Sequence, residues 1–140
     1  MITVDASVWI GFLDLSDPFH AASETLLQHL QKSATPHYSP EFAALEVACA
    51  LARRHRDPDA GRTAAGLLRR NGRLRLIETA RLLPLAEELG PRLSLRGADA
   101  LYAATAQLTA TKLVTWDREL IDRAGALTPE EWLAQQSSSR

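Results

Sequence analysis

Cysteine is almost absent from this chain of 140 residues, in which Cys49 stands alone. A single cysteine excludes an internal disulfide framework and a zinc site built from several thiolates. Cys49 falls in an apolar helical run, where we expect a small buried hydrophobic residue. Long apolar stretches are also missing, and none approaches the roughly 20 residues that a membrane span needs. The acid Asp5 interrupts the first apolar run and no basic segment precedes it, so we expect a cytoplasmic protein with no signal peptide and no membrane contact.

A large excess of one charge is missing as well. The formal net charge is −1, which excludes the overall basic character of many nucleic-acid-binding domains. Lysine occurs only at Lys32 and Lys112, and the remaining basic residues are arginines. Arginine suits bidentate contacts with phosphate, although GC-rich coding produces the same bias. No histidine has metal-site spacing to another, so we interpret them all as surface or structural residues: His20, His29, His37 and His55.

The composition that remains is typical of one globular domain. The chain is 46% hydrophobic and 24% charged, and a domain of this size buries roughly 70% of the surface that its unfolded chain exposes. Repeats, linkers and a second domain are not evident. Short strands are expected at 2–4, 74–77 and 112–116, with marginal ones at 37–38 and 126–127. Helices are expected at 7–13, 20–31, 57–70, 80–89, 98–108 and 117–123, with a helical turn at 129–133.

Two local patterns set further boundaries. Ser39, Pro40 and Glu41 have the order of an N-cap, a proline at the first helical position and a first-turn acid, so they predict a helix from there to about residue 54. The Gly90-Pro91 pair predicts the end of the preceding helix. Because strands alternate with helices, the sequence predicts an α/β fold with a parallel sheet.

Two acids directly follow predicted strands. Asp5 comes after the strand at 2–4, and Asp117 comes after the strand that contains KLVTW. In an open parallel sheet, residues just beyond the carboxyl ends of the strands line the ligand crevice, so these acids are expected to converge. Each acid also fits the N-cap of the helix that follows it, which is a purely structural alternative.

Two further acids lie on predicted helices. Glu46 has only apolar residues at its i±3 and i±4 positions, so its carboxylate belongs to a stripe that faces the core or a cleft. Glu41, in contrast, is explained by the helix dipole. Asp99 heads the segment GADALYAATA, where it could serve as an N-cap or first-turn acid.

Four neighbouring carboxylates need counter-charge, because like charges disfavour ionisation. A divalent cation supplies that charge, and oxygen-only ligands suit Mg²⁺ or Mn²⁺ better than Zn²⁺. Such a cation activates water and stabilises phosphate oxygens, which points to phosphoryl-group chemistry. The hydroxyls of Ser7 and Thr115 lie within two residues of Asp5 and Asp117, and could orient a carboxylate or a water as outer-shell groups. They could equally be ordinary cap and strand residues.

Four segments carry a family resemblance: ITVDASVWI, SPEFAALEVACAL, RGADALYAATA and LVTWDREL. In this order they resemble the four acidic motifs of PIN domains, and more specifically those of VapC, the toxin of type II toxin–antitoxin pairs. The resemblance runs from residue 2 to about residue 133. It implies a PIN-like three-layer α/β/α sandwich with a short-stranded parallel sheet. A single domain at 1–134 and a polar C-terminal tail at 135–140 follow from it.

The resemblance implies a metal-dependent endoribonuclease that uses Mg²⁺ or Mn²⁺. Matched motif by motif, the catalytic and metal-binding acids are Asp5, Glu46, Asp99 and Asp117. Thr115 takes the position of a threonine or serine common in these motifs. Many relatives have one more acid nearby, and Asp122 is a candidate that we leave unassigned. The implied partners are an RNA substrate, a second copy in a homodimer and a cognate antitoxin, with promoter DNA contacted only through the antitoxin.

RNA contacts are less specific in the sequence. Arg53, Arg54 and Arg56, at the end of the helix that carries Glu46, could neutralise RNA phosphates, or simply complement the helix dipole. Trp9 and Trp116 each lie near a motif acid, and core packing is favoured over base stacking for both. Two other functions are alternatives: a catalytically silent PIN-like module that binds RNA or protein, and a receiver-like or phosphatase-like protein. The latter fits poorly, because the chain lacks an adjacent acidic pair and has Ser7 where a DxD motif needs an acid.

Overall fold

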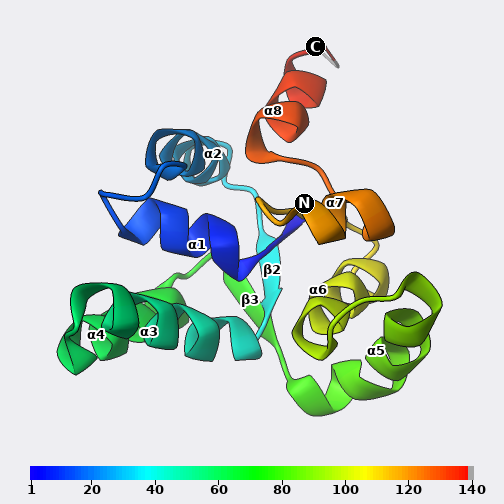
Figure 1. The fold of residues 1–140 in the computed structure, drawn as a ribbon. Helices are drawn as coiled ribbons and strands as arrows, with labels where there is room; N and C mark the ends of the chain where they lie inside the picture. The colour runs from blue at the N-terminus through cyan, green and yellow to red at the C-terminus, as the bar shows by residue number, and fades with distance from the viewer. Residues whose placement is uncertain (139–140) are drawn as a thin grey trace.

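The computed structural model describes residues 1–138 (Figure 1). The strands are β1 (Ile2–Val4), β2 (His37–Pro40), β3 (Leu74–Ile77) and β4 (Lys112–Val114). The helices are α1 (Ala6–Leu13), α2 (His20–Lys32), α3 (Phe42–His55), α4 (Pro58–Arg70), α5 (Thr79–Leu93), α6 (Gly97–Leu108), α7 (Arg118–Ala124) and α8 (Pro129–Ser138). In this part of the chain, no helix combines the length and the hydropathy that a membrane span requires.

The described strands form a four-stranded parallel sheet in the order β3-β2-β1-β4. Helices α1 to α4 lie on one side of this sheet, and α5 and α6 lie on the other (Figure 1). The predicted α/β sandwich is therefore confirmed. From β1 the chain steps outward to β2 and β3, and then returns to place β4 on the other side of β1. The carboxyl ends of β1 and β4 are neighbours at this switch point, which is where open parallel sheets form a crevice.

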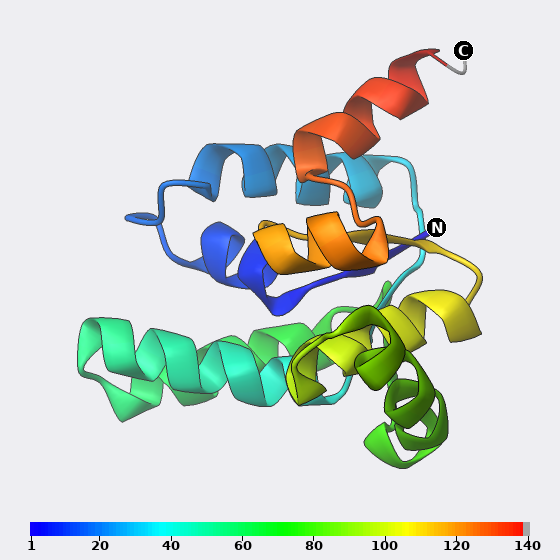
Figure 2. The ribbon, with the colours of Figure 1, turned by 45° about the vertical axis from the view of Figure 1, so that its right-hand side comes forward.

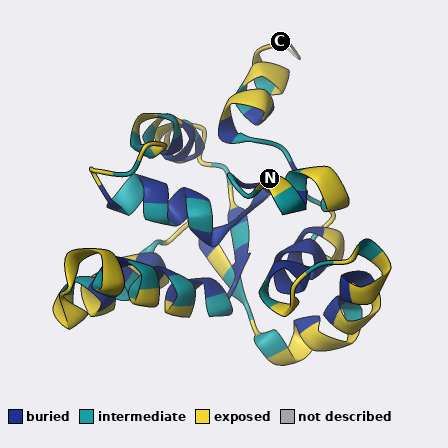
Figure 3. Cartoon of the chain, viewed as in Figure 1, coloured by how far each residue is buried: buried dark blue, intermediate teal, exposed yellow. Residues whose placement is uncertain are grey.

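The core packs apolar helix faces against both sides of the sheet. Ile2 and Val4 of β1 and Val114 of the neighbouring β4 are fully buried, and the outer faces of the helices carry the exposed residues (Figure 3). A second cluster, around Leu82 and Ala104, lies between α5 and α6. Burial of each large apolar side chain stabilises the fold by about 1.5–3 kcal/mol.

The predicted helix start at Ser39-Pro40 is wrong, because both residues belong to β2 and α3 begins at Phe42. Ser39 is buried, and its hydroxyl donates to the carbonyl of Val4 at 2.6 Å instead of capping a helix. Glu41 precedes α3, and its carboxylate accepts from the backbone nitrogen of Thr79 at 3.0 Å. The local pattern matched a cap, but strand pairing and burial determined the outcome.

The predicted stop at Gly90-Pro91 is also wrong, since α5 continues to Leu93. Gly90 is buried, and a Cβ added to it would lie 3.1 Å from the Cβ of Ala100 on α6. Its role is therefore close helix packing rather than termination. Pro91 lies in the last turn, where the helix ends through Ser94 in the left-handed conformation.

Cys49 is exposed, so its predicted burial is wrong. The buried stripe of α3 runs through Ala43, Val47 and Leu51, and Cys49 lies on another face.

At the C-terminal end, α8 extends to Ser138, beyond the expected turn at 129–133. Helix α8 packs on α2 (Figure 2). The ring of Trp132 there meets that of His29 edge-on. The expected polar tail therefore begins in helix, and its residues 139–140 lie outside the described part.

Candidate active site

Asp5 stands where β1 ends and α1 begins, with its side chain buried beside β4. One carboxylate oxygen, Oδ2, accepts from the backbone nitrogen of Ser7 and from the Thr115 hydroxyl, both at 3.0 Å. The first contact caps α1, so the structural alternative for Asp5 is correct as well. Burial raises the pKa of Asp5, while the hydrogen bonds from Ser7 and Thr115 act in the opposite direction.

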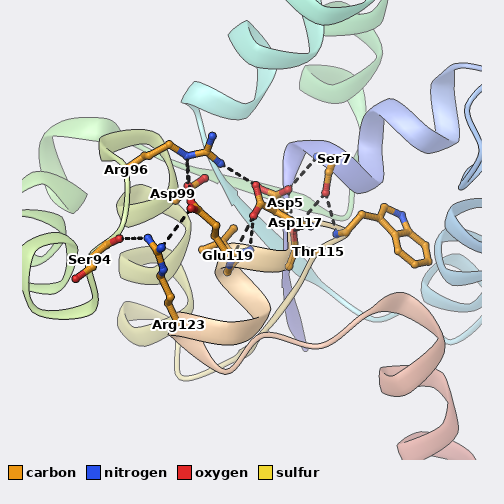
Figure 4. A network of polar contacts seen from close by, with 11 residues as sticks. Asp5, Ser7, Ser94, Arg96, Asp99, Thr115, Asp117, Glu119 and Arg123 are labelled. Atoms are coloured by element: carbon orange, nitrogen blue, oxygen red, sulfur yellow. Dashed lines mark hydrogen bonds and ion pairs between the residues drawn. The ribbon is translucent and has the colours of Figure 1, made fainter.

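Asp117 caps α7 and lies three residues beyond β4, which ends at Val114 rather than at the predicted residue 116. Its Oδ1 accepts from the backbone nitrogens of Glu119 and Leu120 at 2.8 and 3.4 Å. Its own backbone nitrogen donates to the Thr115 hydroxyl at 2.9 Å. The hydroxyls of Ser7 and Thr115 lie 3.3 Å apart. The Thr115 hydroxyl thus contacts both acids, and the Ser7 hydroxyl contacts Thr115 and accepts from the backbone nitrogen of Trp116 (Figure 4).

Glu46 reaches the site from α3, on the stripe that was predicted to face the core or a cleft. Its Oε1 accepts from the hydroxyl of Tyr102 on α6 at 2.7 Å. Burial raises the pKa of Glu46, and the charges of Asp5 and Asp99 raise it further. Burial likewise raises the pKa of Tyr102, next to the charges of Asp5 and Glu46, so Tyr102 remains a neutral donor to Glu46.

Asp99 lies in the first turn of α6, and its carboxylate is held by Arg96. The guanidinium donates through Nε to Asp99 Oδ2 and through Nη2 to Asp117 Oδ2, both at 2.9 Å (Figure 4). Its Nε also lies 3.5 Å from Glu119 Oε2. Sequence reasoning missed Arg96 and Glu119 as members of this network. The available signal was the spacing: a basic residue three positions before one motif acid, and an acid two positions after another.

The four predicted acids line a single cleft of about 310 Å³, together with Ser7 and Arg96. They come from the end of β1, from α3, from α6 and from the N-cap of α7, so the fold brings together positions far apart in sequence. The mutual effects on pKa follow from this proximity, since Asp99 raises the pKa of both Asp5 and Glu46. The arrangement concentrates negative charge in a partly buried place, which suits a cation.

Other predicted residues lie outside this cleft. Arg54 is engaged elsewhere, with its Nη1 at 3.0 Å from Asp14 Oδ2 and at 2.7 Å from Asp17 Oδ2. Arg53 and Arg56 are exposed at the end of α3, and their contact with RNA stays a prediction. Asp122 is exposed on α7 and is not a lining residue of the cleft.

The two tryptophans near the acids have packing roles, as favoured. Trp9 is buried, and its indole nitrogen donates to the Ser39 hydroxyl at 3.2 Å. Trp116 stacks on Phe19 with ring centroids 4.2 Å apart, and its indole nitrogen donates to Ser23.

With this geometry in view, the comparison with known protein families is decisive. Residues 2–126 match the model of the PIN domain. The chain belongs to the PIN domain family. The four acids that line the cleft of this PIN domain lie at one end of its sheet. No match to this PIN domain was found among curated protein sequences.

Solved structures share the fold of this PIN domain at low sequence identity. The Mycobacterium tuberculosis toxin VapC20, described as cleaving the sarcin-ricin loop, is 20% identical with a TM-score of 0.68 over 84% of this chain and 91% of that chain. A toxin–antitoxin complex from Klebsiella pneumoniae is 20% identical with a TM-score of 0.65, over 92% and 98% of the two chains. VapBC2 from Rickettsia felis, bound to a DNA fragment from its promoter, is 15% identical with a TM-score of 0.67, over 91% and 97%.

Proposed function

We propose that this PIN domain is a metal-dependent endoribonuclease and the toxin of a toxin–antitoxin pair. The convergence of Asp5, Glu46, Asp99 and Asp117 in one cleft carries the proposal. Family membership supports it, and so does the similarity of the fold to toxins such as the M. tuberculosis protein that cleaves the sarcin-ricin loop. These similarities also favour a cognate antitoxin as partner. The homodimer and the RNA substrate are further parts of the proposal.

The chemistry of the donor groups fits Mg²⁺ or Mn²⁺, because the candidate ligands are carboxylate oxygens. The four acids that line the cleft would hold the ion: Asp5, Glu46, Asp99 and Asp117. A divalent cation bound there would lower the pKa of a water molecule and place positive charge beside the phosphate oxygens.

The chain itself supplies position and proton control. Thr115 orients the carboxylate of Asp5 and the backbone of Asp117 through one hydroxyl. Burial raises the pKa of Glu46, so its carboxylate is a better proton acceptor than an exposed one. Tyr102 donates to one oxygen of Glu46, so the other oxygen remains free to accept. Each acid thereby has a defined orientation before substrate arrives.

Cleavage of total RNA tests the proposal. The protein is purified free of any co-expressed partner and incubated with total RNA in Mg²⁺ or Mn²⁺, with EDTA in parallel reactions. We expect discrete fragments that disappear in EDTA and with Asp5→Asn, since this change removes charge and keeps shape. Asp122→Asn is the matched control, because it removes one exposed acid outside the cleft and should leave the fragments unchanged.

The outcomes separate the two functions that the sequence left open. An Asp5→Asn protein that is folded by circular dichroism and still cuts RNA at the parental rate contradicts the role of Asp5. Intact RNA in every reaction, together with no heat of Mn²⁺ binding at millimolar concentration, favours the catalytically silent binding module instead.

A further inference from the structure

Arg96 is the one basic side chain among the described residues that line the cleft. Its guanidinium joins two acids from different elements, Asp99 on α6 and Asp117 before α7, with both contacts at 2.9 Å. The five donors of a guanidinium form a rigid fork that matches carboxylates, and such charge-assisted bonds are about twice as strong as neutral ones. Arg96 is therefore the main counter-charge that the chain itself offers to these acids.

The oxygens that Arg96 holds are oxygens that a divalent cation would need. Oδ2 of Asp99 and Oδ2 of Asp117 each accept a hydrogen bond from the guanidinium. Among the described residues, no three carboxylate, imidazole or thiol groups converge closely enough to surround an ion as they stand. The acids thus share a cleft while Arg96 spans two of them, and a cation must replace these contacts to gain both carboxylates.

The side chain of Arg96 can be displaced at low energetic cost, whereas the two acids are held in position. Its side chain is 65% exposed, while the side chains of Asp99 and Asp117 are 11% and 26% exposed. Arg96 precedes α6 in extended backbone and contributes no cap bond from its side chain. Exposed ion pairs contribute little to stability, so a bound divalent ion readily outweighs them. The carboxylates remain fixed by α6 and by the cap of α7.

We propose that Arg96 is an exchangeable counter-ion of the site. In the metal-free protein it bridges Asp99 and Asp117, and it releases both carboxylates when a divalent cation binds. This proposal rests on the proposed function, because it presumes that the acids hold a metal. The proposal predicts a change in metal affinity opposite to that expected of a purely structural arginine. Removal of Arg96 should tighten metal binding, whereas loss of a structural support should weaken it.

Calorimetric titration of the RNA-free protein with Mn²⁺ tests the exchange. We expect Arg96→Gln to bind Mn²⁺ about tenfold more tightly than the parent, because the ion no longer competes with two charge-assisted hydrogen bonds. Arg96→Lys keeps the charge without the fork and should fall between the two. Arg92→Gln is the matched control: it removes the same charge from an exposed pair with Glu88 on α5, and should leave the affinity unchanged.

Thermal unfolding provides a second measurement on the same proteins. Without metal, Arg96→Gln should unfold at a lower temperature than the parent, since Asp99 and Asp117 lose their shared counter-charge. Saturating Mn²⁺ should remove this difference, because the ion supplies the missing charge. A difference that persists unchanged in Mn²⁺ would assign Arg96 to the scaffold and overturn the exchange.

The remaining outcomes distinguish failure of this proposal from failure of the proposed function. Parental Mn²⁺ binding with unchanged or weaker binding by Arg96→Gln overturns the exchange and leaves the metal site in place. An Arg96→Lys protein identical to the parent reduces the effect to local charge and also overturns the exchange. If neither the parent nor Arg96→Gln binds Mn²⁺, the metal site of the proposed function fails as well.

Discussion

At the scale of single residues, the hydroxyl of Thr115 connects two of the four acids. It donates to Asp5 and accepts from the backbone nitrogen of Asp117, and the side chain is fully buried. Both bonds disappear if the hydroxyl is replaced by a methyl group of similar size, which leaves Asp5 short of one donor. The orientation of the acid depends on this neighbour as much as on its own backbone.

We therefore expect Thr115→Val to weaken Mn²⁺ binding by roughly 10- to 100-fold, the usual effect of removing an outer-shell partner. Unfolding by urea should show a loss of about 1–3 kcal/mol from the unpaired buried groups. Thr115→Ser retains the hydroxyl and should recover the affinity. Parental Mn²⁺ affinity in Thr115→Val would show that Asp5 is oriented without Thr115.

The acids of the site could be predicted from sequence because each stands in an unusual place. Asp5 and Asp117 follow apolar strands, and Glu46 is surrounded by apolar residues at helical spacing. Arg96 could not be found in the same way, because an exposed arginine before a helix is ordinary and its importance lies in which acids it reaches. Arg54 shows the converse: its position suggested RNA phosphates, and the fold pairs it with two aspartates instead.

At the scale of elements, α3 and α4 pack as a close antiparallel pair that carries Glu46 toward the cleft. Gly61 on α4 is buried, and a Cβ there would collide with the carbonyl oxygen of Ala48 and lie 2.9 Å from the Cβ of Ala52. Gly66 on the same helix differs, because its Cβ would meet only the mobile end of the Arg70 side chain, at 3.0 Å or more. Close packing of α3 against α4 thus requires a glycine at position 61 but not at position 66.

Gly61→Ala is expected to destabilise the protein by about 1–3 kcal/mol, the usual cost of overpacking, despite the better helix propensity of alanine. Gly66→Ala should instead stabilise it by about 0.5–1 kcal/mol, because alanine loses less backbone entropy. Chemical denaturation measures the free energy of unfolding of both variants. Equal effects of the two changes would contradict close contact between α3 and α4 at Gly61.

Boundaries between elements were predictable where local signals and packing agree. The helix opened by Asp57-Pro58 and the strand at 74–77 have the predicted limits, since cap chemistry and apolar pattern point the same way. Ser39-Pro40 and Gly90-Pro91 failed because tertiary contacts outweigh local preference. A strand beside β1 needs Ser39 for the Val4 carbonyl, and α6 needs Gly90 for close approach.

At the scale of the whole molecule, an ion-pair cluster fastens the connection between α1 and α2 to the end of α3. Asp14 is buried at its centre, where the hydroxyl of Ser16 and the guanidinium of Arg54 lower its pKa from 3.8 to about 2. A carboxyl with a depressed pKa stabilises the folded state above its unfolded pKa and loses that contribution as pH falls through its folded pKa.

The free energy of unfolding of the parent should therefore exceed that of Asp14→Asn by roughly 1–2 kcal/mol above pH 5. This difference should shrink as the pH falls from about 4 to about 2, as read from urea unfolding at each pH. Asp59→Asn, at an exposed acid paired with Arg62, serves as control and should show no such trend. A difference that is constant from pH 5 to pH 2 would contradict the ionic role of Asp14.

The middle position of β1 determines when the cleft can exist as the chain is synthesised. Asp5 leaves the ribosome near the start of translation, but Thr115, which orients it, follows 110 residues later. Until β4 emerges, one side of β1 has no partner and the acids from α6 and β4 are not yet assembled, as is usual for folds dominated by long-range strand pairing. A chain proposed to cut RNA therefore spends most of its own translation without a cleft, while it is attached to a particle made largely of RNA.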